Sequence, residues 1–230
     1  IIVPFRVTKD ELVARHGAPE SKVHVVNYGL DHSVYHPLPN IERNTRRILY
    51  IGEVSRAKGV DVLIRAFAIV KKSVPDAELL IGGKTNKDQP LLEELSRSLE
   101  LRDIEFKGFI PEAELASYYA SAAVMVFPSR YGFGLSSLEA MACGTPVVVA
   151  ATLDAPEFIA DAGLLVKPGD AEDLASNILR LLQEPALRAE FGERGMARAA
   201  EYSWAATAMK TREVYRAVLG AAQDFSTVAE

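Results

Sequence analysis

Short apolar runs alternate with helix-spaced apolar positions along most of the chain. Six runs rich in β-branched and apolar residues predict strands. They span residues 47–51, 78–81, 104–107, 124–127, 146–149 and 164–166. Between the first two runs, apolar residues from Val60 to Val70 recur at the spacing of one helix face. This alternation predicts an α/β fold in which helices cover both faces of a parallel sheet.

Three further helices are predicted between and after these strands. One has a leucine face over residues 91–99, one opens at Pro111, and one covers residues 174–182 and ends near Pro185. From Pro185 to Leu219 the pattern is helical and contains no strand. The first forty residues differ, because a helix ending at Gly17 and a strand over 22–29 precede a proline-bearing connector. We expect the helical carboxy-terminal arm to reach beyond its own sheet.

Composition narrows the function classes. The chain has 230 residues, of which 49% are hydrophobic, so it can bury a full core. Its formal net charge of −5 and its lack of clustered Lys and Arg argue against a nucleic-acid partner. Cys143 is the only cysteine, and we expect it to be a buried small residue. The spacing of the four histidines matches no common zinc pattern, so we expect no metal and no cofactor.

The segment 128–149, PSRYGFGLSSLEAMACGTPVVV, carries the most specific chemistry. A strand ends, Gly132 and Gly134 form a turn, and a helix is predicted from about Leu135 to Cys143. The free N–H groups of such a helix start favour a phosphate or carboxylate. Glu139, about one turn into the helix, could accept the paired hydroxyls of a ribose. The alternative is that the glycines only shape the turn and that Glu139 is a solvated helix residue.

Seven segments in order resemble the carboxy-terminal half of a family four, or group 1, glycosyltransferase of the GT-B fold. They are KVHVVNYGLDHSVYHP, ILYIGEVSRAKGVDVLIRAF, AELLIGG, IEFKGFIPEAELASYYASAAVMVFPS, GFGLSSLEAMACGTPVVVA, DAGLLVKPGDAEDLASNI and YSWAATAMKTREVYRAVL. The resemblance covers nearly the whole chain. It implies a Rossmann-like domain that binds a nucleotide-diphosphate sugar donor, while an amino-terminal half absent from this chain binds the acceptor. It also implies transfer of the sugar with retained configuration.

The resemblance also assigns roles to individual residues. Lys58 matches a lysine that contacts the donor diphosphate, Glu139 an acid that binds ribose hydroxyls, and residues 108–110 a loop that borders the base. The full set of donor-binding candidates is Gly52, Glu53, Arg56, Lys58, Gly82, Gly83, Gly108, Phe109, Ile110, Tyr131, Gly132, Phe133, Gly134, Leu135 and Glu139. No catalytic residue is assigned within this chain.

The chain departs from the family pattern at two important positions. Glu53 stands where the family usually has an arginine that pairs with the lysine, and a carboxylate there would repel a diphosphate. Tyr131 stands where the family usually has a glutamate next to the donor sugar. Arg56 and Arg130 lie close enough in sequence to replace some positive charge. A third departure is Asp154, Ala155 and Pro156 before Glu157, where the family usually has a pair of glycines.

Three function classes therefore stay open. The first is an active retaining hexosyl-type glycosyltransferase with an altered donor site, acting in polysaccharide or glycoconjugate biosynthesis. The second is a non-catalytic relative that serves as a binding or partner domain. The third is another Rossmann enzyme, such as a nucleotide-sugar epimerase or a dehydrogenase, although GEVSRAKG lacks the dehydrogenase glycine pattern. The histidines and Cys143 offer no hydrolase arrangement.

The expected organisation follows from this resemblance. Residues 1–40 are predicted to hold the end of the amino-terminal domain and the linker, residues 41–202 the nucleotide-sugar-binding domain, and residues 203–230 a carboxy-terminal helix and tail. We expect a cytoplasmic location, with a position at the cytoplasmic face of a membrane left open for the intact protein. No apolar run here approaches the length needed to span a bilayer.

Overall fold

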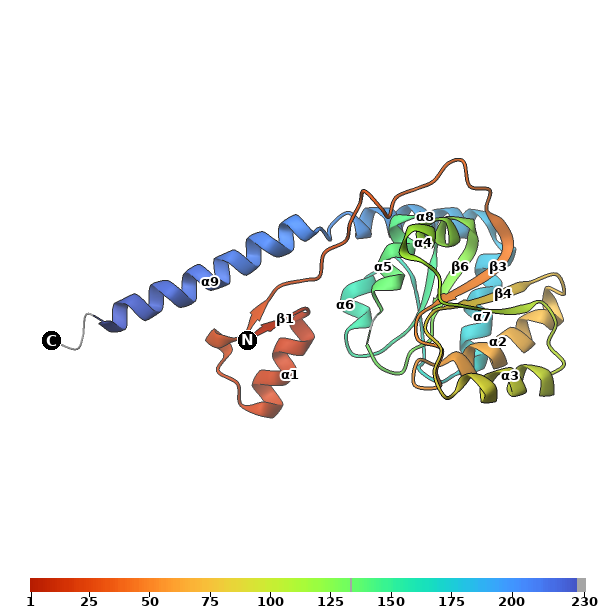
Figure 1. The fold of residues 1–230 in the computed structure, drawn as a ribbon, viewed down its shortest axis with the longest axis horizontal. Helices are drawn as coiled ribbons and strands as arrows, with labels where there is room; N and C mark the ends of the chain where they lie inside the picture. Colours follow the sequence, from red (N-terminus) through yellow and green to blue (C-terminus); the bar gives the residue numbers. More distant parts are fainter. Residues whose placement is uncertain (133, 227–230) are drawn as a thin grey trace. The chain divides into compact units, whose positions relative to one another are not determined.

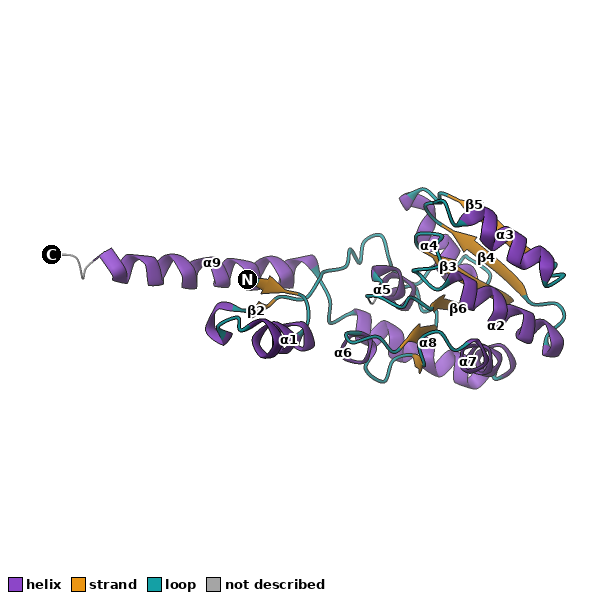
Figure 2. Cartoon of the chain, turned by 90° about the horizontal axis from the view of Figure 1, so that it is seen from below, coloured by secondary structure: helices purple, strands orange, loops and turns teal. Residues whose placement is uncertain are grey.

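The computed structural model contains a six-stranded, fully parallel sheet with the strand order β5-β4-β3-β6-β7-β8. The structure describes residues 1–132 and 134–226, with side chains described as far as residue 220. The strands are β3 (Asn44–Ile51), β4 (Glu78–Gly82), β5 (Ile104–Gly108), β6 (Ala122–Phe127), β7 (Val147–Ala150) and β8 (Leu164–Val166). The predicted α/β fold class is thereby confirmed, and Figures 1 and 2 show the sheet with its covering helices.

The chain divides into two compact units. Residues 32–200 form the larger unit, and residues 1–31 together with 201–230 form the smaller one. We predicted segment boundaries at residues 40 and 202. In the structure both ends of the chain belong to one unit, which local sequence patterns do not indicate.

Helices cover both faces of the large sheet. On one face lie α2 (Val60–Ser73), α3 (Gln89–Ser98) and α7 (Ala171–Gln183), and on the other lie α4 (Glu112–Ser121), α5 (Leu135–Ala142) and α8 (Pro185–Ala199) (Figure 1). The apolar stripe predicted for the first helix is buried, since Leu63, Phe67 and Val70 are each 0% exposed. Every residue of β6 is buried, whereas the edge strand β5 alternates exposed and partly buried residues. The core therefore lies around β3 and β6.

All six predicted strands are present, and each observed strand overlaps its predicted range. The short helix α6 (Ala155–Ile159) was not predicted. It buries Ala155, Phe158 and Ile159, but five residues are too few to establish a helical period in the sequence. The departure from the family pattern at Asp154 to Glu157 thus coincides with a helix start.

The smaller unit contains α1 (Arg6–His16), a 3-10 turn at Glu20–Lys22 and α9 (Trp204–Ser226). Its two strands, β1 (Ile2–Val3) and β2 (His24–Val25), pair in parallel. The predicted helix end at Gly17 is confirmed: this glycine has a φ of 63° and its N–H bonds to the carbonyl of Leu12. The strand predicted over 22–29 is wrong in length, because only His24 and Val25 pair.

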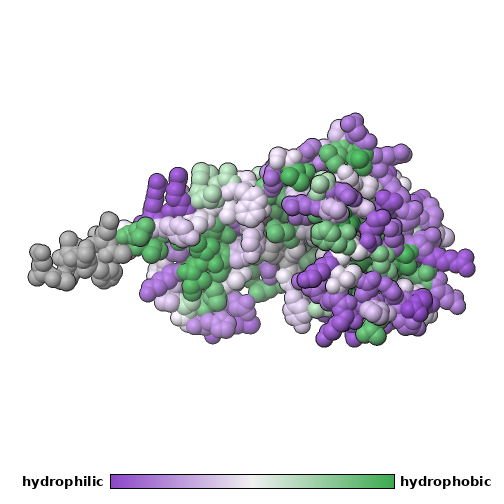
Figure 3. All heavy atoms as spheres, in the orientation of Figure 1, coloured by the Kyte–Doolittle hydropathy of each residue, from purple (hydrophilic) through white to green (hydrophobic). Residues whose placement is uncertain are grey.

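The smaller unit also exposes many apolar side chains. In Figure 3 hydrophobic atoms gather on its visible face, beside hydrophilic ones. The exposed apolar residues of this unit are Ile1, Ile2, Tyr28, Trp204, Met209, Tyr215, Val218 and Leu219. Apolar side chains that gather on one face are typical of a surface that contacts another part of a protein.

The start of α7 supports a stability prediction. The Asp170 carboxylate accepts hydrogen bonds from the backbone N–H groups of Glu172 and Asp173, each at 3.1 Å. Such a cap satisfies N–H groups that the helix itself leaves free. We expect Asp170→Ala to lower the free energy of unfolding by about 1 kcal/mol, measured by urea denaturation.

Asp154 offers a matched control for this substitution. It occupies the same position before α6, but its side chain makes no capping hydrogen bond. Asp154→Ala should therefore change stability by only a few tenths of a kcal/mol, about the usual surface effect. Equal losses in the two variants would contradict the capping role of Asp170.

Candidate functional site

The candidate site lies at the carboxyl ends of the strands, where the direction of the strand order changes. From β3 the chain proceeds outward to β4 and β5, and then returns to β6 on the other side of β3. Ligands of open α/β sheets bind in the crevice outside such a switch point. The loops that follow β3 and β6 are therefore the structural centre of the site.

Four predicted glycines lie side by side at this edge. The Gly52 N–H donates to the carbonyl of Gly82 at 3.0 Å, and the Gly83 N–H donates to the carbonyl of Gly108 at 2.8 Å. Gly83 has a φ of 130°, and a Cβ there would run into the carbonyl oxygen of Gly52. The ends of β3, β4 and β5 can thus meet only because no side chain stands between them.

The loop predicted to border the base follows β5. A Cβ on Gly82 would lie 2.5 Å from Cδ1 of Ile110, so this loop packs directly on the end of β4. Ile110 is 5% exposed, whereas Phe109 is 78% exposed. Of the three predicted residues, Ile110 serves as a packing anchor, and Phe109 offers an aromatic face to solvent.

Glu53 is turned toward the neighbouring loop. Its Oε1 accepts a hydrogen bond from Nδ2 of Asn86 at 2.7 Å, in the loop between β4 and α3. Its carbonyl accepts a hydrogen bond from the buried hydroxyl of Tyr50 at 2.7 Å. Burial raises the pKa of Tyr50 well above its usual range, so this hydroxyl stays protonated and keeps donating. Glu53 thus ties two loops together.

Lys58 lies where the loop after β3 touches the loop after β6. Its neighbour Gly59 caps α2 with a φ of 74°, and a Cβ on Gly59 would run into the carbonyl oxygen of Pro128. Lys58 is partly exposed, and its ammonium forms no ion pair with a described residue. The contact between the loops therefore places an available cation at the switch point.

The turn before α5 has the backbone that the sequence predicts. Gly132 and Gly134 have φ values of 72° and 68°, which favour glycine. A Cβ on Gly134 would lie 2.5 Å from the ring of Phe127, so the turn folds closely over the end of β6. Leu135, 37% exposed, begins α5. The predicted site residue Phe133 lies outside the described residues.

Arg56 and Tyr131 share a cavity of about 310 Å³. Its other lining residues are Ala57, Asp61, Asp88 and Arg130. One guanidinium nitrogen of Arg130 lies 3.7 Å from Oδ2 of Asp61, which links the loop after β6 to the first turn of α2. Both arginines that could replace lost positive charge therefore border the same space.

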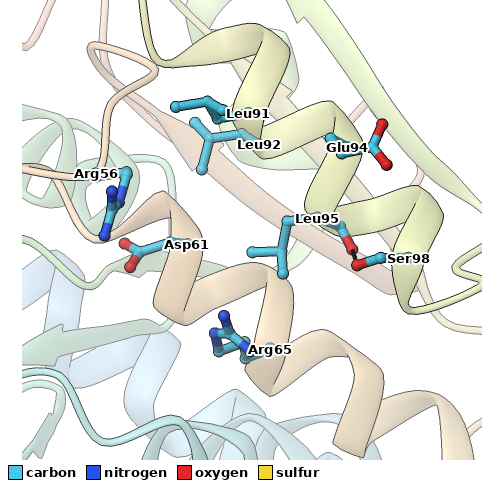
Figure 4. A pocket seen from close by; sticks show the side chains of 8 residues that line it. All are labelled: Arg56, Asp61, Arg65, Leu91, Leu92, Glu94, Leu95 and Ser98. Carbon is cyan, nitrogen blue, oxygen red and sulfur yellow. Dashed lines mark hydrogen bonds between the residues drawn. The ribbon is translucent and has the colours of Figure 1, made fainter.

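A second cavity of about 300 Å³ continues along α2 and α3. Figure 4 shows leucines of α3 facing Asp61 and Arg65 of α2, with Arg56 at one end. Arg56 and Asp61 line both cavities. Arg56 thus lies on the α2 and α3 side of the sheet, whereas Glu139 belongs to α5 on the opposite side.

Glu139 has a partner that sequence reasoning missed. The hydroxyl of Tyr119 in α4 donates to Oε2 of Glu139 at 2.6 Å. Burial raises the pKa of Glu139, the bond from Tyr119 lowers it, and the charge of Glu112 raises it, with a net rise. Tyr119 occupies the apolar face of α4, and a tyrosine in such a position signals a hydroxyl that needs a buried partner.

Three other possibilities raised by the sequence are a reactive cysteine, a metal site and a membrane span. Cys143 is 2% exposed, and burial raises the pKa of its thiol to about 12, so it is the buried small residue we expected. Within the described part of the chain, no group of three or more His, Cys, Asp or Glu is arranged to hold a metal ion. None of the described helices combines the length and the apolar character that crossing a membrane requires.

Comparison with known proteins agrees with this architecture. The O-antigen chain mannosyltransferase B of Escherichia coli is 34% identical over 171 residues, which cover 73% of this chain and 45% of that protein. The sucrose-phosphate synthase of Thermosynechococcus elongatus has a TM-score of 0.84 and 31% identity, over 96% of this chain and 58% of that one. The Anabaena HepE protein, solved with UDP-glucose, shares the fold with a TM-score of 0.81 at 20% identity, over 95% of this chain and 63% of that one.

The family itself is shown by a direct match. The chain spans about half the length of the curated relatives that it matches, with 45% and 53% for two of them. Residues 35–198 match the family described as Glycosyl transferases group 1. That range includes every strand of the large sheet and every predicted donor-binding residue. With its GT-B structural neighbours, this chain belongs to the group 1 glycosyltransferases.

Proposed function

We propose that this chain is the donor-binding, carboxy-terminal half of a retaining glycosyltransferase. It binds a nucleoside-diphosphate sugar, and the sugar passes to an acceptor held by an amino-terminal half. The bond between the sugar and the diphosphate breaks, and the oxygen of an acceptor hydroxyl forms the new bond. The nucleoside diphosphate leaves and takes up the hydroxyl proton, and the configuration at the sugar carbon is retained. The printed ligand of HepE, UDP-glucose, is a donor of this class.

One observation carries this proposal. Lys58, the first turn of α5 and Glu139 belong to the two loop-and-helix segments that meet at the switch point of the sheet. A cation and a helix N-terminus favour a diphosphate, and a carboxylate one turn further along suits the ribose. In our proposal Lys58 and the helix start bind the diphosphate, and Glu139 binds the ribose.

The leaving diphosphate needs positive charge as the sugar bond breaks. In our proposal Lys58 and the N-terminus of α5 supply it through fixed, preorganised groups. No described side chain of this half is assigned as a nucleophile. We propose that no metal ion is required, since the ammonium and the helix start together neutralise developing charge without one.

An amino-terminal half completes the proposed enzyme. The relatives are about twice as long as this chain, and the smaller unit exposes apolar residues of β1 and α9. We propose that this surface contacts the amino-terminal half, which binds the acceptor. We also propose a cytoplasmic location for the intact protein, where nucleotide sugars are available as donors.

A non-catalytic binding or partner domain is the second candidate. Glu53 favours it, because an exposed carboxylate beside the proposed diphosphate site opposes anion binding. Its hydrogen bond to Asn86 limits this effect, since the carboxylate is engaged away from α5. The two candidates differ in whether the site binds a nucleotide at all.

Calorimetric titration of the 230-residue chain with UDP, GDP and ADP tests the proposal directly. We expect saturable binding of one of the three with a dissociation constant between about 1 µM and 1 mM. Competition by the matching nucleotide sugar then identifies the donor class. Absence of binding for all three nucleotides at millimolar concentration would overturn the donor-site proposal and favour the partner domain.

A further inference from the structure

A short hydrogen bond joins two helices beside the proposed ribose site. The hydroxyl of Tyr119 lies 2.6 Å from Oε2 of Glu139, a distance typical of hydroxyl donation to a charged carboxylate. Tyr119 is 0% exposed. No described residue is bonded to the other carboxylate oxygen, Oε1. One oxygen of Glu139 is thus held from inside the protein while the second is left for a ligand.

Tyr119 is itself held on several sides. Its carbonyl accepts a hydrogen bond from Oγ1 of Thr145 at 2.6 Å, just beyond the end of α5. The N–H of Thr145 bonds in turn to the carbonyl of Ala140 at 2.9 Å. The ring of Tyr35 packs at 6.1 Å between centroids. The hydroxyl therefore has little freedom to leave Glu139.

The groups around Glu139 determine whether it is ionised, and the hydrogen bond from Tyr119 is one of them. From α4, Tyr119 donates to Glu139 and the charge of Glu112 acts on it, while Cys143 follows the last residue of α5. Arg43 donates a hydrogen bond to the carbonyl of Gly144 at 2.9 Å, and its positive charge lowers the pKa of Cys143. Burial and the charge of Glu112 both raise the pKa of Glu139 and so favour its protonated form, whereas the hydrogen bond from Tyr119 lowers this pKa and favours the carboxylate.

We infer that Tyr119 is a positioning residue for nucleotide binding, which fixes Glu139 so that its second oxygen accepts the ribose hydroxyls of the donor. This inference rests on the proposed donor site and deepens it. A supporting residue whose side chain is locked by packing keeps a contact residue in its productive geometry. Because Tyr119 is fully buried and its hydroxyl acts through Glu139, we expect its effect to be confined to the ribose.

The test compares Tyr119→Phe with the unchanged chain, using the nucleoside diphosphate that binds and its 2′,3′-dideoxy analogue. We expect the variant to bind the ribose form about fivefold more weakly, because a carboxylate that loses its fixed donor is less well placed. The dideoxy form should bind both proteins equally, since it has no hydroxyls for Glu139 to accept. A purely structural role would not separate these ligands.

Tyr118→Phe is the matched control. It removes the same atom from the neighbouring residue, whose hydroxyl interacts with Lys107 of β5. We expect its affinity for the ribose form to be unchanged. The binding of the ribose form should also weaken as the pH falls through the raised pKa of Glu139, and Tyr119→Phe should move this midpoint upward.

The outcomes separate the inference from the function on which it rests. Binding of the ribose form by Tyr119→Phe with unchanged affinity and unchanged pH midpoint overturns the inference. Equal weakening of the ribose and dideoxy forms also overturns it, while leaving the donor site standing. If the unchanged chain binds none of the nucleotides, both the function and the inference are rejected.

Discussion

Replacing Gly59 by alanine is expected to lower the free energy of unfolding by about 3–4 kcal/mol and to abolish measurable nucleotide binding. The left-handed φ of 74° strains any residue with a Cβ, and here the added atom would also run into the carbonyl oxygen of Pro128. Relief requires the loop after β3 to move away from the loop after β6. Denaturant unfolding and calorimetric titration measure the two effects.

Gly169→Ala separates the effect of backbone strain from the effect of the clash with Pro128. Gly169 also has a positive φ, 80°, but nothing lies within 4 Å of a Cβ placed there. Its loss should be about 1–2 kcal/mol, from backbone strain alone, with nucleotide affinity unchanged. If both variants lose the same stability, the contact between Gly59 and Pro128 does not hold the site together.

Replacing Lys58 by alanine is expected to weaken the binding of a nucleoside diphosphate about ten- to a hundredfold. Hydrogen bonds to charged groups contribute about 1.5–3 kcal/mol, and Lys58 is a flexible cation at the junction of the two site loops. The variant should keep its stability, because the ammonium pairs with no described residue. Titration of the variant and the unchanged chain at equal ionic strength measures the loss.

Two controls identify the diphosphate as the group that Lys58 contacts. Lys72→Ala removes an exposed lysine from the last turn of α2 and should leave affinity unchanged. The corresponding nucleoside, which carries no phosphate, should show no difference between Lys58→Ala and the unchanged chain. The assignment of Lys58 to the diphosphate is wrong if the nucleoside loses as much affinity as the diphosphate. Added salt should reduce the Lys58 effect, since mobile ions screen a partly exposed charge.

Much of the fold was predictable because it depends on local periodicity. The apolar runs of β3 to β8 and the helical stripe of α2 place buried residues at fixed intervals, and each period belongs to one type of element. Failures occurred where the pattern was too short or the partner too distant. Helix α6 has only five residues. Strand β2 is limited to His24 and Val25 because its partner β1 consists of only Ile2 and Val3.

The candidate site was likewise predictable where it depends on local backbone geometry, and not where it depends on distant partners. Glycines at strand ends and the turn before α5 are visible in the sequence, because positive φ values at a strand-to-helix turn require them. The direction of the Glu53 carboxylate was not visible, since its partner Asn86 belongs to another loop. The same holds for Tyr119, which meets Glu139 only after α4 and α5 pack together.

The sequence by itself determined the order of the elements, the parallel α/β architecture and the residue types at the edge of the sheet. Only the tertiary structure decided that Gly59 rests on Pro128, that Glu53 binds Asn86 and that Tyr119 holds Glu139. The physical reason is that periodicity and backbone preference act within a few residues, whereas hydrogen-bond partners are chosen when separate elements pack and buried polar groups must be satisfied.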